Sequence, residues 1–173
     1  MIQNCSSWKV LQQFLNNPLK KMHIREISRN VKLAPTSVKL HINRLLKENL
    51  IEEGKEIFKY YIANFDNERF RFYKRISTIM LIYESGLIDY LDEKCSPDAI
   101  MLFGSCAKGE DISSSDMDIF ILGKEYKVAL DKYEKILNKK IQLFFSKKIN
   151  QLPVELRNNV LNGIKLAGYL KVF

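Results

Sequence analysis

Residues 99–122 read AIMLFGSCAKGEDISSSDMDIFIL, and this stretch decides the fold of the second half of the chain. Two apolar runs, 99–103 and 119–122, predict two buried strands. A Gly-Ser pair and a loop of small and acidic residues join them. Because side chains two positions apart in a strand share a face, we expect Asp116 and Asp118 to project together.

These features together predict a site for a cation and a phosphate. Asp116 and Asp118 place two carboxylates on one face, and such hard oxygen ligands suit Mg²⁺. Gly104 and Ser105 form a small-residue turn that lets the backbone come close to a phosphate sharing the metal. The alternative is an Asp-x-Asp pair that lies by chance in a loop, and the Gly-Ser turn argues against it.

The same residues resemble the nucleotidyltransferase signature of the polymerase β superfamily. The stretch is similar to the GSxxxG…SDxD pattern of the minimal nucleotidyltransferases of archaea and bacteria, and the resemblance spans residues 85–170. The matching residues are Gly104, Ser105, Gly109, Ser115, Asp116 and Asp118. In that family the glycines and serines would bind a nucleoside triphosphate, while the catalytic aspartates hold Mg²⁺. The resemblance therefore implies attack of a hydroxyl on the α-phosphate with release of pyrophosphate.

The sequence departs from the family pattern at Gln142. A predicted helix over 126–138 precedes a predicted strand over 140–144, and related sequences carry a third carboxylate on this strand, at the position aligned with Gln142. A glutamine is a poor base and a weak Mg²⁺ ligand. Two hypotheses follow: a Mg²⁺-dependent nucleotidyltransferase acting on a protein or other hydroxyl acceptor, or a transcriptional regulator whose inactive domain senses nucleotide or binds protein. Family resemblance also implies a small helical toxin-like protein as partner.

The first half of the chain predicts three helices and a hairpin. Helices are expected over 6–16, 24–31 and 35–49, and the strands 51–53 and 57–62 flank a turn at 54–56. This order resembles the winged helix-turn-helix of MarR- and ArsR-like regulators, in which the third helix enters the major groove of duplex DNA. Residues expected to contact DNA are Thr36, Ser37, Lys39, Asn43, Arg44, Lys55 and Lys59. A solvated helix face, a protein partner or RNA are the alternatives.

The charge distribution agrees with a DNA-binding first half. Residues 1–75 hold 15 Lys and Arg against 7 Asp and Glu, whereas residues 76–173 hold 13 of each. All of the net charge of +8 therefore lies in the first half, as expected for a segment that binds a polyanion.

Together these features predict an α/β (α+β) protein: a winged helix-turn-helix followed by a nucleotidyltransferase fold with a small mixed β-sheet flanked by helices. The predicted domains are 1–66 and 85–173, joined by a connecting helix over 67–84 that is a candidate for homodimerisation. The longest nearly apolar run, 76–83, is too short to cross a membrane. Three scattered cysteines support neither disulfides nor zinc, and a cytoplasmic location is expected.

Overall fold

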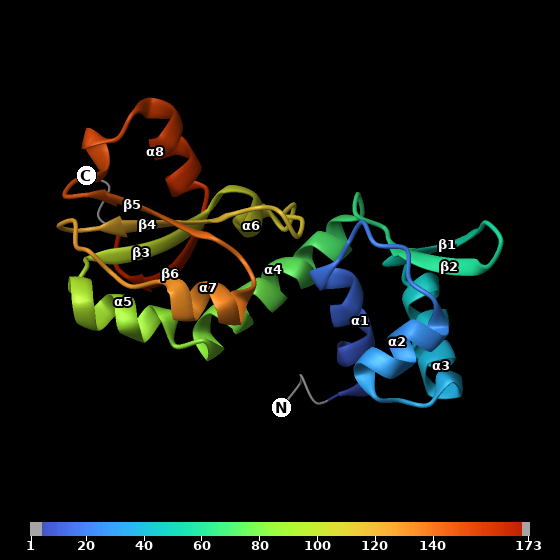
Figure 1. Cartoon of the computed structure of the whole chain (residues 1–173). Helices are drawn as coiled ribbons and strands as arrows, with labels where there is room; N and C mark the ends of the chain where they lie inside the picture. Colours follow the sequence, from blue (N-terminus) through green and yellow to red (C-terminus); the bar gives the residue numbers. More distant parts are fainter. Residues whose placement is uncertain (1–4, 171–173) are drawn as a thin grey trace. The chain divides into compact units, whose positions relative to one another are not determined.

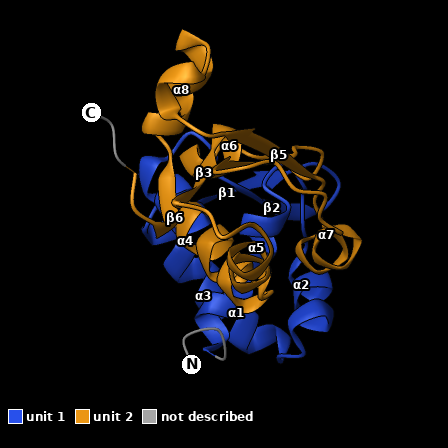
Figure 2. Cartoon of the chain, turned by 90° about the vertical axis from the view of Figure 1, so that its left-hand side faces the viewer, with its two compact units in different colours: residues 1–74 blue, residues 75–173 orange. Residues whose placement is uncertain are grey.

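The computed structural model describes residues 5–170, so the outermost ends of the predicted domains, 1–4 and 171–173, lie outside the described residues. The chain divides into two compact units, residues 1–74 and 75–173 (Figure 2). Helices and two small sheets make up the described part, which confirms the predicted α+β class.

The first unit contains the predicted three helices and hairpin. Its elements are α1 (Ser6–Asn16), α2 (Ile24–Val31), α3 (Pro35–Lys47), β1 (Ile51–Lys55) and β2 (Lys59–Ala63) (Figure 1). Helix α3 begins at Pro35, where the missing N–H costs nothing in the first turn. The apolar faces of the three helices meet the hairpin in one core, centred on Phe14, Ile27, Ile42 and Tyr61.

The hairpin turn lies later than the sequence predicts. Strand β1 continues through Gly54 to Lys55, which pairs with Lys59, and the turn is made by residues 56–58. Gly54 faces the Tyr60 ring across the ladder, and a Cβ at Gly54 would collide with that ring. The glycine therefore serves close packing inside a strand, not the backbone conformation of a turn.

The helix that the sequence predicts over 67–84 is α4 (Glu68–Glu84), and the boundary between the units falls inside it. Its early residue Phe70 belongs to the first core, and its late residue Ile82 belongs to a core of the second unit. Gly86, with φ of 74°, separates α4 from α5 (Leu87–Cys95).

The second unit is built on a four-stranded mixed sheet in the order β5-β4-β3-β6. Its further elements are β3 (Ala99–Phe103), α6 (Gly104–Lys108), β4 (Met117–Leu122), α7 (Asp131–Leu137), β5 (Ile141–Ser146), the 3-10 helix η2 (Ile149–Gln151), α8 (Val154–Leu161) and β6 (Ile164–Gly168). Strand β3 is antiparallel to both neighbours, and β5 is parallel to β4, to which α7 connects it. The predicted small mixed sheet flanked by helices is thus confirmed.

Helices cover both faces of this sheet (Figure 1). Ile100 and Ile119 face a core shared with α5 and α7, whereas Met101 and Phe120 face a core shared with η2 and α8. All five residues of β3 are buried, because the strand is central and covered on both sides. No helix of the described residues is long and apolar enough to span a membrane.

Two predicted elements of the second unit differ in the structure. The helix expected over 126–138 begins only at Asp131. The segment Ile164–Gly168, for which the sequence predicts no strand, is a strand that pairs with β3.

Candidate functional site

Asp116 and Asp118 lie where β4 enters the sheet. Asp118 is in the strand, opposite Phe103 of β3 on one side and Gln142 of β5 on the other. Met117 and Ile119 point to the opposite face, where both are buried in the core beneath the sheet. The alternation predicted from the sequence therefore holds, and both carboxylates remain partly exposed to solvent.

The Gly-Ser turn lies directly against Asp118. Gly104 follows the last residue of β3 and adopts a left-handed conformation with φ of 71°. A Cβ at Gly104 would collide with the Oδ2 atom of Asp118. The backbone angle favours glycine here, and any larger residue would also displace the Asp118 carboxylate.

Burial and a neighbouring charge affect the ionisation of Asp118. Burial raises the pKa of Asp118 above its ordinary value, and the neighbouring charge of Asp116 raises this pKa further. A cation between the two side chains would relieve this repulsion, because it favours the charged form of both.

Gln142 lies beside the aspartates, as its alignment with the family's third carboxylate predicts. Its register partner on β4 is Asp118, and its side-chain Nε2 donates a hydrogen bond of 2.6 Å to Oδ2 of Asp116. The amide thus contacts the carboxylate pair without adding a negative charge.

The remaining predicted phosphate-binding residues lie at the edges of this arrangement. Gly109 ends α6 with φ of 72° and is separated from Gly104 by the length of that short helix. The hydroxyl of Ser115 accepts a hydrogen bond of 2.9 Å from the backbone N–H of Ile112. In this structure Ser115 therefore stabilises the loop that leads to Asp116.

An open cavity of about 460 Å³ adjoins Asp116. The loop before β4 forms one wall, and α7 with the segment that joins it to β5 forms the other. Its lining residues are Ser113, Ser114, Ser115, Asp116, Asp131, Glu134, Lys135, Asn138, Lys139 and Lys140. Each of these residues has a polar or charged side chain, which suits a hydrophilic ligand.

The residues present fit a hard divalent cation held by two carboxylates. Within the described chain no group of three or more His, Cys, Asp or Glu side chains is placed to hold a metal. The raised pKa of Asp118 beside Asp116 is the observation that favours a cation at this pair. Further ligands would come from phosphate or water oxygens, as is usual for Mg²⁺.

The residues predicted to bind DNA all lie in the first unit. Along α3, Thr36, Lys39, Asn43 and Arg44 are exposed, and Ser37 is half-buried. Within residues 5–170, no ion pair involves Lys39 or Arg44.

The hairpin is less basic than its two lysines suggest. Lys59 forms an ion pair of 2.6 Å with Glu53, and Glu56 of the turn pairs with Lys21. Lys55 is exposed. The sequence contained the signal for this difference, since three glutamates, Glu52, Glu53 and Glu56, accompany the two lysines.

Sequence reasoning missed one residue of the second unit, Lys139. It precedes β5, and its ammonium group contacts the loop before Asp116. Its acceptors include backbone carbonyls, which have no sequence signature, so only the fold reveals the contact.

Comparison with known proteins gives one match, and it lies in the second unit. No curated protein and no solved structure matches the chain. Residues 85–168 match the family model described as polymerase beta, nucleotidyltransferase, and this region contains the Gly-Ser turn, both aspartates and Gln142. The match therefore supports a nucleotidyltransferase domain within residues 85–168.

Proposed function

We propose that this protein binds DNA through its first unit and uses its second unit to bind a nucleoside triphosphate with Mg²⁺ and transfer a nucleoside monophosphate. The acceptor is a hydroxyl group of a protein or another molecule. The observation that carries the proposal is the carboxylate pair Asp116 and Asp118, of which Asp118 packs against the left-handed Gly104 turn.

Each residue has a distinct task in this proposal. Asp116 and Asp118 hold the cation, and Gly104 with Ser105 leaves room for the phosphates beside them. A divalent metal bound there would supply charge neutralisation of the triphosphate for in-line displacement at the α-phosphate. The 2.6 Å hydrogen bond from Gln142 holds the Asp116 carboxylate in a fixed orientation.

A second candidate function is favoured by Gln142. An amide does not take a proton from an attacking hydroxyl, and loss of a general base lowers a rate by about 10²- to 10⁴-fold. In this alternative the protein is a transcriptional regulator whose second unit binds nucleotide, or a partner protein, without turnover.

Nucleotide labelling distinguishes the two candidates. The protein is incubated with Mg²⁺ and each α-³²P-labelled nucleoside triphosphate, and covalent label and released pyrophosphate are measured. Asp116→Asn and Asp118→Asn should abolish both signals. Asp131→Asn changes a carboxylate of α7 that lines the same cavity, and this variant should keep both signals. Binding of nucleotide without label or pyrophosphate would favour the regulator.

A gain-of-function variant sharpens this test. Gln142→Asp places a third carboxylate opposite Asp118. If the missing base limits the wild type, Gln142→Asp should raise the rate of pyrophosphate release by about 10²-fold or more. An unchanged rate would show that Gln142 is not what limits transfer.

For the DNA-binding arm, we propose that α3 carries the main contacts with phosphates and bases. Lys39 and Arg44 are exposed and unpaired within the described residues, whereas Lys59 is neutralised by Glu53. A basic residue that must first leave an ion pair contributes less to binding a phosphate than an unpaired one.

Duplex binding measured by fluorescence anisotropy tests this assignment. Lys39→Ala or Arg44→Ala should weaken binding and lower the slope of log K against log salt by about 1 for each phosphate that the variant no longer neutralises. Lys59→Ala is the matched control and should change the slope less. Salt-independent binding, or an equal effect of all three variants, would contradict the proposal.

A further inference from the structure

We infer that Lys139 is a positioning residue that sets the place of Asp116 for metal binding, through the backbone of the loop before β4. The inference rests on the proposed function, because it concerns the same carboxylate pair. Lys139 is not one of the carboxylates that would hold the cation, and it acts through the peptide that precedes Asp116.

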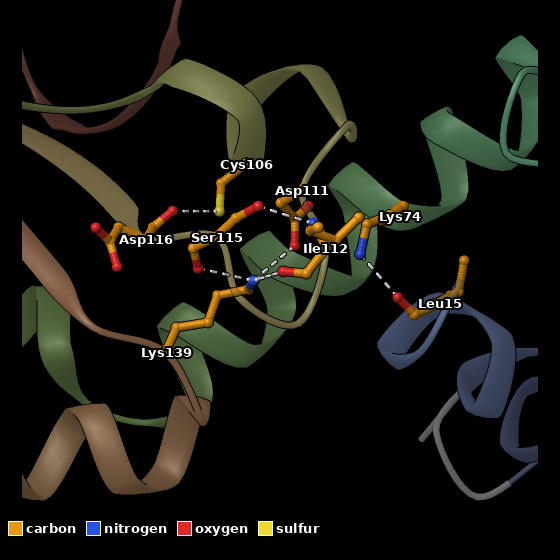
Figure 3. Close-up of polar contacts among 8 residues, drawn as sticks. All are labelled: Leu15, Lys74, Cys106, Asp111, Ile112, Ser115, Asp116 and Lys139. Carbon is orange, nitrogen blue, oxygen red and sulfur yellow. Dashed lines mark hydrogen bonds and ion pairs between the residues drawn. The ribbon is translucent and has the colours of Figure 1, made fainter. Parts of the chain in front are cut away.

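The ammonium group of Lys139 contacts three acceptors of one loop (Figure 3). It donates to the carbonyl oxygens of Ile112 at 2.7 Å and Ser115 at 3.2 Å. It also forms an ion pair of 3.0 Å with Oδ2 of Asp111. These acceptors match the three N–H donors of a lysine side chain.

Burial makes this arrangement specific. The side chain of Lys139 is 13% exposed and that of Asp111 is 1% exposed. A charge removed from water must be compensated by partners of good geometry, so the loop is held where its carbonyls meet the ammonium. Bonds between Ile112 and Ser115, from the N–H of each to an oxygen of the other, close the loop on itself.

The contact reaches Asp116 through a planar peptide. The carbonyl of Ser115 belongs to the peptide unit whose nitrogen is that of Asp116, so fixing this oxygen fixes the plane from which Asp116 projects. On the other side, the carbonyl of Asp116 accepts a hydrogen bond from Sγ of Cys106 at 3.5 Å. Lys139 and Cys106 therefore hold the two peptides that flank the Asp116 side chain.

Lys140 provides a matched comparison. It is the next residue, it lines the same cavity, and it forms an ion pair of 2.7 Å with Glu134. Its side chain is 75% exposed and donates to no carbonyl of the loop. Both lysines would contribute a positive charge near Asp116, but only Lys139 holds the Ser115 peptide.

The test measures metal affinity. Mn²⁺ replaces Mg²⁺ at oxygen-rich sites, and its free concentration is followed by electron paramagnetic resonance during titration of the full chain. The samples are the wild type, Lys139→Met, Lys140→Met and Asp116→Asn, with folding checked by circular dichroism. Lys139→Met should weaken Mn²⁺ binding by about 10- to 100-fold, as loss of a residue that orients a metal ligand does. Lys140→Met should leave the affinity unchanged.

The outcomes separate this inference from the proposed function. If the wild type binds no Mn²⁺ that Asp116→Asn removes, the proposed metal site fails, and the inference fails with it. If the wild type binds Mn²⁺ and folded Lys139→Met binds it equally well, or Lys140→Met has the same effect as Lys139→Met, the inference alone is overturned.

A second variant covers the case in which Lys139→Met does not fold. Lys139→Arg keeps the charge and the ion pair with Asp111, but its planar fork does not reproduce the three directions of an ammonium group. Lys139→Arg should therefore fold and bind Mn²⁺ more weakly than the wild type. Wild-type affinity in Lys139→Arg would overturn the inference.

Discussion

Asp118 is held in a state that favours binding of a positive charge. It lies between two neighbouring strands, and burial together with the charge of Asp116 raises its pKa. A carboxyl group whose pKa is raised on folding binds its proton more readily in the folded state. Its contribution to stability is therefore complete below the unfolded pKa and is lost as the pH rises through the folded pKa.

The raised pKa of Asp118 predicts how Asp118→Asn changes the thermal stability of the protein. Without divalent metal at neutral pH, the variant should unfold at a higher temperature than the wild type, because asparagine removes the buried charge. The difference should shrink as the pH falls towards about 4, the ordinary pKa of an aspartate. Thermal unfolding followed by circular dichroism between these pH values measures it.

Asp131→Asn is the control, since Asp131 is an exposed carboxylate outside the pair. A variant Asp118→Asn that is less stable than the wild type at neutral pH without metal would contradict the prediction. Added Mg²⁺ should stabilise the wild type and leave Asp118→Asn unaffected.

At the scale of residues, the sequence predicted the carboxylate pair because strand alternation is a local rule. It also placed Gln142 correctly, because α7 and β5 follow β4 at a spacing that the family pattern supplies. The pairing of Lys59 with Glu53 was missed, because the predicted hairpin turn lay two residues too early and therefore shifted the cross-strand partners.

Two left-handed glycines precede or begin helices of the second unit, and they differ in their surroundings. Gly104 starts α6 and Gly86 precedes α5, with φ of 71° and 74°. A Cβ at Gly86 would meet no atom within 4 Å, whereas a Cβ at Gly104 would collide with Asp118. Comparing substitutions at Gly86 and Gly104 therefore separates the cost of the backbone angle from the cost of displacing the carboxylate.

Gly86→Ala should lower the free energy of unfolding by about 1–2 kcal/mol, the usual cost of a left-handed conformation for a residue with a Cβ. Gly104→Ala should cost more and should also weaken Mn²⁺ binding, because Asp118 must move. Denaturant unfolding and Mn²⁺ titration of both variants measure the two effects. Equal metal affinity of the two variants would contradict a role of the Gly104 turn in placing Asp118.

At the scale of elements, sequence periodicity predicted α1 and α2 at their observed bounds. It failed where an element depends on distant partners. Strand β6 is five residues long and exists because β3 offers it a free edge, with Ala99 opposite Gly168. Helix α7 begins at Asp131 although the preceding residues, 126–130, contain apolar side chains that allow a longer helix by pattern alone.

At the scale of the molecule, the two units have separate hydrophobic cores. The core of the first unit is formed by residues between Val10 and Phe70, and those of the second by residues between Ile82 and Leu166. A ligand that binds one folded unit stabilises that unit by mass action.

In differential scanning calorimetry, each ligand should therefore raise the transition temperature of the unit that binds it and leave the other unchanged. At 100 times its dissociation constant, Mg²⁺–nucleotide should stabilise the second unit by about 2.7 kcal/mol and raise only its transition temperature. A DNA duplex should raise only the other transition. A single transition that shifts with both ligands would show that the two units unfold as one.

The order of the elements along the chain also has a consequence for synthesis on the ribosome. The first unit is contiguous and ends at residue 74, so its core is complete before the second half has been translated. The sheet of the second unit is completed much later, because strand β3 lacks one neighbour until β6, at Ile164–Gly168, has emerged. Domains generally fold as units during translation, the N-terminal one first. A nascent chain would thus present a finished basic module while β3 still has an open edge.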